Sequence, residues 1–239
     1  MSGLVLIWVA LLGPFGALDD TFFWAHMSQH LILTMLAAPL LVLGEPVLMV
    51  LRLSPRDTRR KLILPVLRSR FVRILTDPIV TWVLFAAVVL GTHFSPFYDY
   101  SLNHAWAHQF IEHPLFLGAA LLYFYPLLGN SPGPNPVPPA RRVVSLALMM
   151  APEAFTGFFI YSTPYVMYRF YASTDRPFGP GPLADQQLGG ALMWSSGMLL
   201  DTAWLVLAAH DWLRADARRT RRIDAAVARD LSRPRIRFL

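Results

Sequence analysis

Two histidines at helical spacing are the clearest candidates for chemistry in this sequence. His26 and His30 stand four positions apart in the stretch 26–30, with Met27 between them. Residues four apart lie on the same face of an α-helix, so both imidazoles can bind a single atom. This spacing favours a metal or cofactor ligand pair.

A second group downstream repeats the pattern. His104 and His108 are also four positions apart, and Glu112 and His113 follow one helical turn later. Like the first pair, this group stands at the head of an apolar run. Two helices that each present such a pair would together supply four ligand nitrogens, so we predict one shared metal site.

The chain contains no cysteine, so a metal must be held by His, Met, carboxylate or backbone groups. We expect Met27, Met150 and Met193 near the histidines, and imidazole together with thioether favours Cu(I). Carboxylates such as Glu112 and Glu153 would accept hydrogen bonds from the imidazoles and fix their tautomers. The predicted cofactor is therefore copper, as Cu(I).

Interhelical hydrogen bonding, packing, haem and zinc are the alternative interpretations of these residues. A single histidine near a membrane surface more often bonds a neighbouring helix, which is how we interpret His93, and we assign Met35, Met49 and Met149 to packing. Histidine pairs one turn apart would crowd a single haem. The His-Glu-x-x-His motif of zinc hydrolases is absent.

Long apolar blocks must position these residues. Hydrophobic residues make up 55% of the 239-residue chain and charged residues only 15%. Uncharged blocks of about twenty residues cross a bilayer as helices, and the blocks near this length are 3–18, 24–51, 78–94, 104–129, 141–162 and 186–210. We predict an all-α fold, a polytopic membrane helix bundle with about six transmembrane helices, although Gly13-Pro14 interrupts the first.

Basic residues indicate the orientation of this bundle. On one side, the loops between the blocks contain only Arg169 and Arg176 of the 21 Lys and Arg residues. The positive-inside rule therefore places both termini in the cytoplasm. Segregation by loop also explains the basic composition without nucleic acid, which we do not expect as a partner. We divide the chain into one transmembrane domain, 1–210, and a basic cytoplasmic tail, 211–239.

This orientation brings most histidines to one side of the membrane. The outer half of the bilayer or its outer surface would contain His26, His30, His93, His104, His108 and His113. Ionisable residues within spans cost about 2.5–3.5 kcal/mol each on insertion scales, so they usually serve a function or pair with each other. Glu112, Glu153 and Asp201 lie within the expected spans.

A set of short motifs over roughly residues 20–210 resembles the multi-span CtaG family of cytochrome c oxidase assembly proteins. The motifs are His26-Met27-Ser28-Gln29-His30, Ala38-Pro39-Leu40-Leu41, Leu43-Gly44-Glu45-Pro46, His104 to His108 with Glu112-His113-Pro114 and Gly118, Pro164-Tyr165, Asp185-Gln186 with Gly189-Gly190, and Met193-Trp194. Members are described with seven spans, so the six counted here imply a shortened family fold.

The resemblance implies a multi-pass protein of the bacterial inner (plasma) membrane that assists oxidase maturation by handling copper. It adds Asp185 and Gln186 to the site. The expected metal ligands are then His26, His30, His104, His108, His113 and Met27, supported by Glu112, Asp185, Gln186, Met193 and Glu153. The expected partners are cytochrome c oxidase subunits, a periplasmic or extracytoplasmic copper donor and membrane lipid.

On this reading the protein is not an enzyme: it would hold copper near the outer membrane face and pass it to the oxidase without chemical turnover. Two alternatives stay open at this point. One is a membrane haem or quinone oxidoreductase, and the other is a metal-free assembly scaffold.

Overall fold

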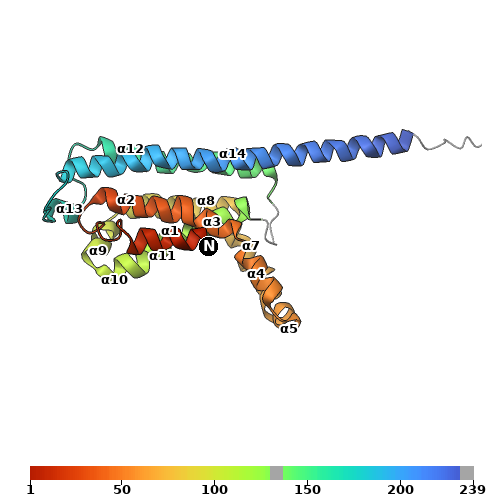
Figure 1. Cartoon of the computed structure of the whole chain (residues 1–239), viewed down its shortest axis with the longest axis horizontal. Coiled ribbons are helices and arrows are strands. Elements are labelled where there is room, and N and C mark those ends of the chain that lie inside the picture. Colours follow the sequence, from red (N-terminus) through yellow and green to blue (C-terminus); the bar gives the residue numbers. More distant parts are fainter. Residues whose placement is uncertain (130–136, 232–239) are drawn as a thin grey trace, which may run out of the picture.

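The computed structural model describes residues 1–129 and 137–231, and every regular element within those ranges is a helix. Long helices lie side by side along the molecule, and shorter helices gather at its ends (Figure 1). The prediction of an all-α membrane bundle is confirmed.

The first apolar block is shorter in the structure than the sequence indicates. Helix α1 (Ser2–Leu12) has 11 residues, which at 1.5 Å per residue is about half the thickness of a bilayer core. It ends because Gly13 takes an extended conformation before Pro14, and residues before proline disfavour the helical region. The expected span over 3–18 is therefore replaced by a short helix and a turn through residues 13–22.

The second block forms a continuous helical segment of α2 (Phe23–Leu31), the π-helical turn η1 (Ile32–Ala37) and α3 (Ala38–Leu43). Pro39 has no backbone N–H to offer the carbonyl of Met35 one turn earlier. The indole Nε1 of Trp204 donates to that carbonyl at 2.8 Å instead. The contact satisfies a buried polar group and ties this segment to the last helix.

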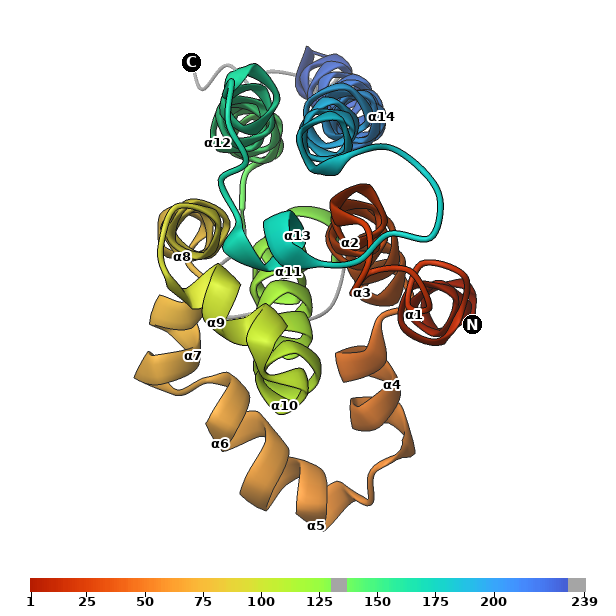
Figure 2. The ribbon, with the colours of Figure 1, turned by 90° about the vertical axis from the view of Figure 1, so that its left-hand side faces the viewer.

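Short helices then form an arc that extends away from the bundle (Figures 1 and 2). They are α4 (Pro46–Leu53), α5 (Arg56–Thr58), η2 (Arg59–Ile63), α6 (Leu64–Leu67) and α7 (Arg70–Leu75). Exposed apolar side chains such as Leu62 and Phe71 alternate here with arginines. This combination is typical of a segment that lies at a membrane interface.

The central part of the chain runs from α8 (Pro78–His93) to α11 (His113–Leu128). Asp77 caps α8 by accepting from the backbone N–H groups of Ile79 and Val80. Between these two helices lie α9 (Phe97–Asn103), α10 (Ala105–Ala107) and the π-helical turn η3 (His108–Glu112). The chain bends by 69° between α8 and α9.

The last two long helices, α12 (Pro139–Ser162) and α14 (Pro182–Leu231), pack along each other, with α13 (Arg169–Ser173) in the connection between them. A Cβ on Gly157 would stand 2.6 Å from the backbone N of Trp194, and one on Gly190 would stand 2.6 Å from that of Tyr161. These glycines therefore permit the close approach of the two backbones. Helix α14 continues without a break past residue 210 into an exposed extension.

Four helical segments of the described residues are long and apolar enough to cross a membrane, or five if the bent pair α8 and α9 forms one span. The four segments that meet this criterion without the bent pair are Phe23–Leu53, Ala105–Leu128, Pro139–Ser162 and Pro182–Arg229. Four of the six expected blocks therefore have a spanning counterpart, and the block 78–94 has one if α8 and α9 form a single span. Helix α1 is too short to be one.

The two ends of the bundle differ in charge. One end contains the turn 13–22, α9, α10 and α13 (Figures 1 and 2). The opposite end contains the basic arc from α4 to α7 and the basic extension of α14 (Figure 1). Basic residues thus segregate along the bundle axis, as the positive-inside rule requires of a membrane protein. We call the end with the turn 13–22, α9, α10 and α13 the outer end. Its placement outside the cytoplasm stays a prediction.

Candidate metal centre

Helix α2, which presents His26 and His30, is fixed at its start by Asp185 of α14. The carboxylate of Asp185 accepts from the backbone N–H groups of Phe23 (2.8 Å) and Trp24 (3.1 Å). It also forms a 2.6 Å ion pair with Arg176. A carboxylate at the first turn complements the positive end of the helix dipole. Asp185 therefore positions the histidine helix without touching the imidazoles.

We expect the Asp185→Asn variant to lose about 3–5 kcal/mol of unfolding free energy, because it leaves the buried guanidinium of Arg176 without a countercharge. Denaturant titration of the detergent-solubilised protein would measure this loss. Asp175→Asn is the matched control because Asp175 is exposed. Equal stability of the two variants would contradict the assigned role.

The first candidate ligand group joins His26 and His30 to Glu112 of η3. The Nε2 atoms of the two imidazoles are 3.0 Å apart. Glu112 Oε1 lies 2.9 Å from Nε2 of His26 and 3.2 Å from Nε2 of His30. All three side chains are buried. The predicted convergence of the first histidine pair on one point is therefore present in the structure.

The π-helical turn η3 brings the second carboxylate oxygen to another histidine. His108 and Glu112 begin and end this turn, and Nδ1 of His108 lies 3.2 Å from Glu112 Oε2. The hydroxyl of Ser101 donates to the same oxygen. Glu112 thus contacts three imidazoles and one hydroxyl, which makes it the central residue of the cluster.

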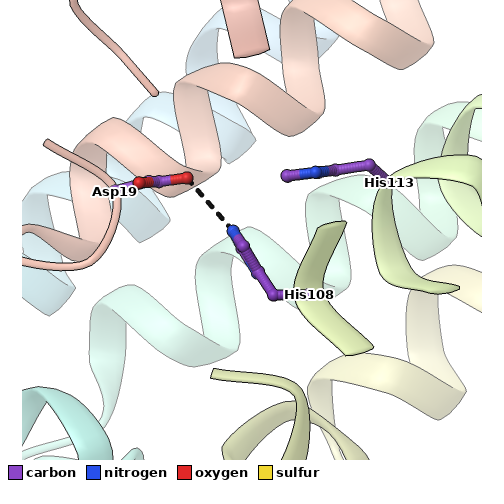
Figure 3. A group of neighbouring side chains, drawn as sticks. All are labelled: Asp19, His108 and His113. Carbon is purple, nitrogen blue, oxygen red and sulfur yellow. Dashed lines mark hydrogen bonds and ion pairs between the residues drawn. The ribbon is translucent and has the colours of Figure 1, made fainter. Parts of the chain in front are cut away.

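The second candidate ligand group contains Asp19, His108 and His113 (Figure 3). Nε2 of His108 lies 3.1 Å from Asp19 Oδ2. His113 points into the same space, and its buried Nε2 has no hydrogen-bond partner within the described residues (Figure 3). Burial alone would raise the pKa of Asp19, but the hydrogen bond with His108 and the imidazole charges hold that pKa below its ordinary 3.8. Asp19 is therefore a carboxylate at neutral pH.

We refer to His26, His30, Glu112, Asp19, His108 and His113 as the outer cluster. It is reached through a pocket of about 220 Å³ whose walls include Asp19, Asp20, His108, Gln109 and His113. A hydrated ion can therefore approach the Asp19 group first, and the His26 group lies behind it.

Tyr171 of α13 constrains the protonation of His26. Burial raises the pKa of Tyr171, so its phenol stays protonated. The hydroxyl donates to the backbone carbonyl of Asp19 at 2.6 Å and lies 3.3 Å from Nδ1 of His26. Because the phenol proton is already used, we infer that Nδ1 of His26 donates to the phenol oxygen. In the neutral imidazole, Nε2 of His26 is then the unprotonated nitrogen, and it faces Glu112.

The spacing of the ligand atoms fits one ion. Ligands about 2.0–2.1 Å from a first-row metal, at angles of 90–110°, stand about 2.8–3.4 Å from one another. The three distances among the His26, His30 and Glu112 atoms are 2.9, 3.0 and 3.2 Å. The group suits metal binding.

The structure separates His104 from the outer cluster, which corrects the predicted pairing of His104 with His108. The chain is extended at His104, φ −131° and ψ 94°, just before α10 begins. The side chain is exposed, stacks on Tyr100 and points Nδ1 at the carbonyl of that residue. His104 and His108 are therefore not on one helix face, because α10 begins between them. His113, rather than His104, joins His108 in a ligand group.

The other predicted supporting residues also lie away from the outer cluster. Gln186 bonds the backbone of Ile160, Tyr165 and Met167, so it fixes the loop after α12. Met27, Met193 and Glu153 line a separate cavity deeper in the bundle. The predicted Met27 ligand is therefore not part of either ligand group.

The sequence did not predict Asp19, which belongs to the outer cluster, or Ser101 and Tyr171, which contact it. Each belongs to a turn or a short helix rather than to a long apolar block. An isolated Asp or Tyr in such segments is common, and only the tertiary fold brings these residues to the histidines. The one available signal was an acidic pair, Asp19-Asp20, directly before the first histidine helix.

Comparison with known proteins gives a family match. Residues 1–215 match the sequence model described as cytochrome c oxidase caa3 assembly factor (Caa3_CtaG). The chain is similar to uncharacterized proteins of Mycobacterium bovis and Mycobacterium tuberculosis, each 33% identical over 215 residues, covering 87% of this chain and 32% of the relative. A Mycobacterium leprae protein is 29% identical over 204 residues, covering 82% and 31%.

The chain thus spans about a third of the length of the curated relatives it matches. No solved structure matches it.

Proposed function

Because this chain belongs to the cytochrome c oxidase caa3 assembly factor family, we propose that it binds copper in the outer cluster and assists its delivery to the oxidase. The partners would be oxidase subunits and an extracytoplasmic copper donor, in the plasma membrane of a bacterium. Copper is the transported ion in this proposal, and the protein performs no chemical turnover.

The observation that supports copper binding most strongly is the spacing of His26, His30 and Glu112. Their ligand atoms lie 2.9–3.2 Å apart in a buried site, a separation suited to one metal ion. Imidazole ligands suit copper, and copper exceeds the other divalent first-row metals in affinity for such donors. In this proposal the acceptor is a copper centre of the oxidase.

Ligand exchange would move the ion. Asp19 and His113 line the open pocket, so a donor protein would present copper there first. His108 contacts both Asp19 and Glu112, and it therefore connects the pocket to the His26 group. Release would follow the reverse order when the apo-oxidase offers a tighter site.

The alternative of a haem protein is less compatible with this geometry. The imidazoles of His26 and His30 meet each other and Glu112 at hydrogen-bond distance, which leaves no space for a porphyrin between them. A Soret absorption band in the purified protein would nevertheless favour that alternative.

The functional test is oxidase maturation in cells whose own copy is replaced by variants. With His26 and His30 both changed to Ala, we expect the membranes to contain oxidase lacking copper and to lose most oxidase activity. His104→Ala should support normal maturation, because His104 lies outside the cluster. Full oxidase copper in the double variant would instead favour a metal-free scaffold.

A further inference from the structure

A second small cavity lies at the centre of the bundle, behind the outer cluster. Its volume is about 20 Å³, enough for one water or ion. Five helices, α2, α8, α11, α12 and α14, meet around it together with the π-helical turn η1. The polar and sulfur-containing side chains in its wall are Met27, His30, Thr34, His93, Glu153 and Met193.

Three of these side chains have a buried polar atom with no hydrogen-bond partner within the described part of the chain. The atoms are Nδ1 of His30, Nε2 of His93 and Oε2 of Glu153. The three residues are 5%, 2% and 5% exposed. Unsatisfied polar atoms are expensive in a membrane interior. Three in the wall of one cavity indicate that the cavity holds something that satisfies them.

The donor set differs from that of the outer cluster. The outer cluster offers imidazole and carboxylate, whereas the cavity adds the two thioethers of Met27 and Met193. Thioether and imidazole together favour Cu(I) over harder divalent ions. Glu153, the carboxyl group in the wall, is buried beside the equally buried Asp201.

His30 connects the two sites. Its Nε2 belongs to the outer cluster, and its Nδ1 is free. One imidazole therefore separates the His26 group from the cavity wall.

We propose that this cavity is a second copper site, selective for Cu(I), and that it stores the ion behind the outer cluster. This inference rests on the proposed copper function, and it assigns a ligand role to His93 and the two methionines.

X-ray absorption of the full chain, loaded anaerobically with Cu(I) in detergent, tests the proposal. We expect about two Cu(I) per wild-type chain and a clear sulfur contribution to the copper environment, because only the cavity offers thioethers. The variant with Met27→Leu and Met193→Leu should lose the sulfur signal and about half of the copper. Leu replaces Met with little change of volume, so the fold should persist.

Met149→Leu is the matched control. Met149 is as buried as Met27 but lies outside the cavity wall, so this variant should keep both ions and the sulfur signal. Wild-type protein that binds copper without any sulfur neighbour would overturn the second site and leave the outer cluster intact. Protein that binds no copper at all would overturn the proposed function itself.

Discussion

Replacing both His26 and His30 by Ala is expected to remove most of the copper bound by the purified chain. The change removes two of the three atoms that lie 2.9–3.2 Å apart around the proposed ion. It also removes the residue shared with the interior cavity. Glu112 alone offers too few ligands to retain copper in that group. Metal analysis after equilibration with Cu(I) and gel filtration would measure the loss.

Two histidines outside the cluster provide controls for this variant. His104→Ala and His210→Ala remove exposed imidazoles, so both proteins should keep wild-type copper content. A double variant of His26 and His30 that remains folded and retains wild-type copper would exclude the outer cluster as the binding site.

Glu112→Gln is expected to weaken copper binding by at least about 10–100-fold, because that is the cost of losing even a residue that only orients the metal ligands. Glutamine preserves the shape of the side chain but removes the negative charge that faces His26, His30 and His108. Its amide nitrogen can only donate, so one oxygen that now accepts hydrogen bonds is lost.

Competition with a chromophoric Cu(I) chelator would measure this affinity. Glu45→Gln is the control, because Glu45 lies at the start of α4 in the arc and outside both metal sites. Equal affinities of the Glu112 and Glu45 variants would show that the carboxylate has no role in binding.

Much of the fold follows from the sequence because its determinants are local. Apolar blocks of bilayer length and the segregation of arginines predict the bundle. The span expected over residues 3–18 was wrong because Gly13 and Pro14, which interrupt the apolar block, end helix α1 at Leu12. The first histidine pair was predicted correctly because both members lie within one helix, where spacing determines the face.

The rest of the site depends on tertiary structure. The spacing of His104 and His108 matches that of the first pair, but α10 begins between them, so the shared face is lost. Asp19 and Tyr171 reach the cluster from segments far apart in sequence. No local pattern predicts such contacts. Asp185, expected near the metal, fixes the start of α2 instead.

Copper quantification of the wild-type chain, purified in detergent and exposed to Cu(I), tests the central claim most directly. The account predicts copper that survives gel filtration, with nitrogen and oxygen neighbours from the outer cluster in its X-ray absorption spectrum. A folded chain that binds no copper under these conditions would contradict it.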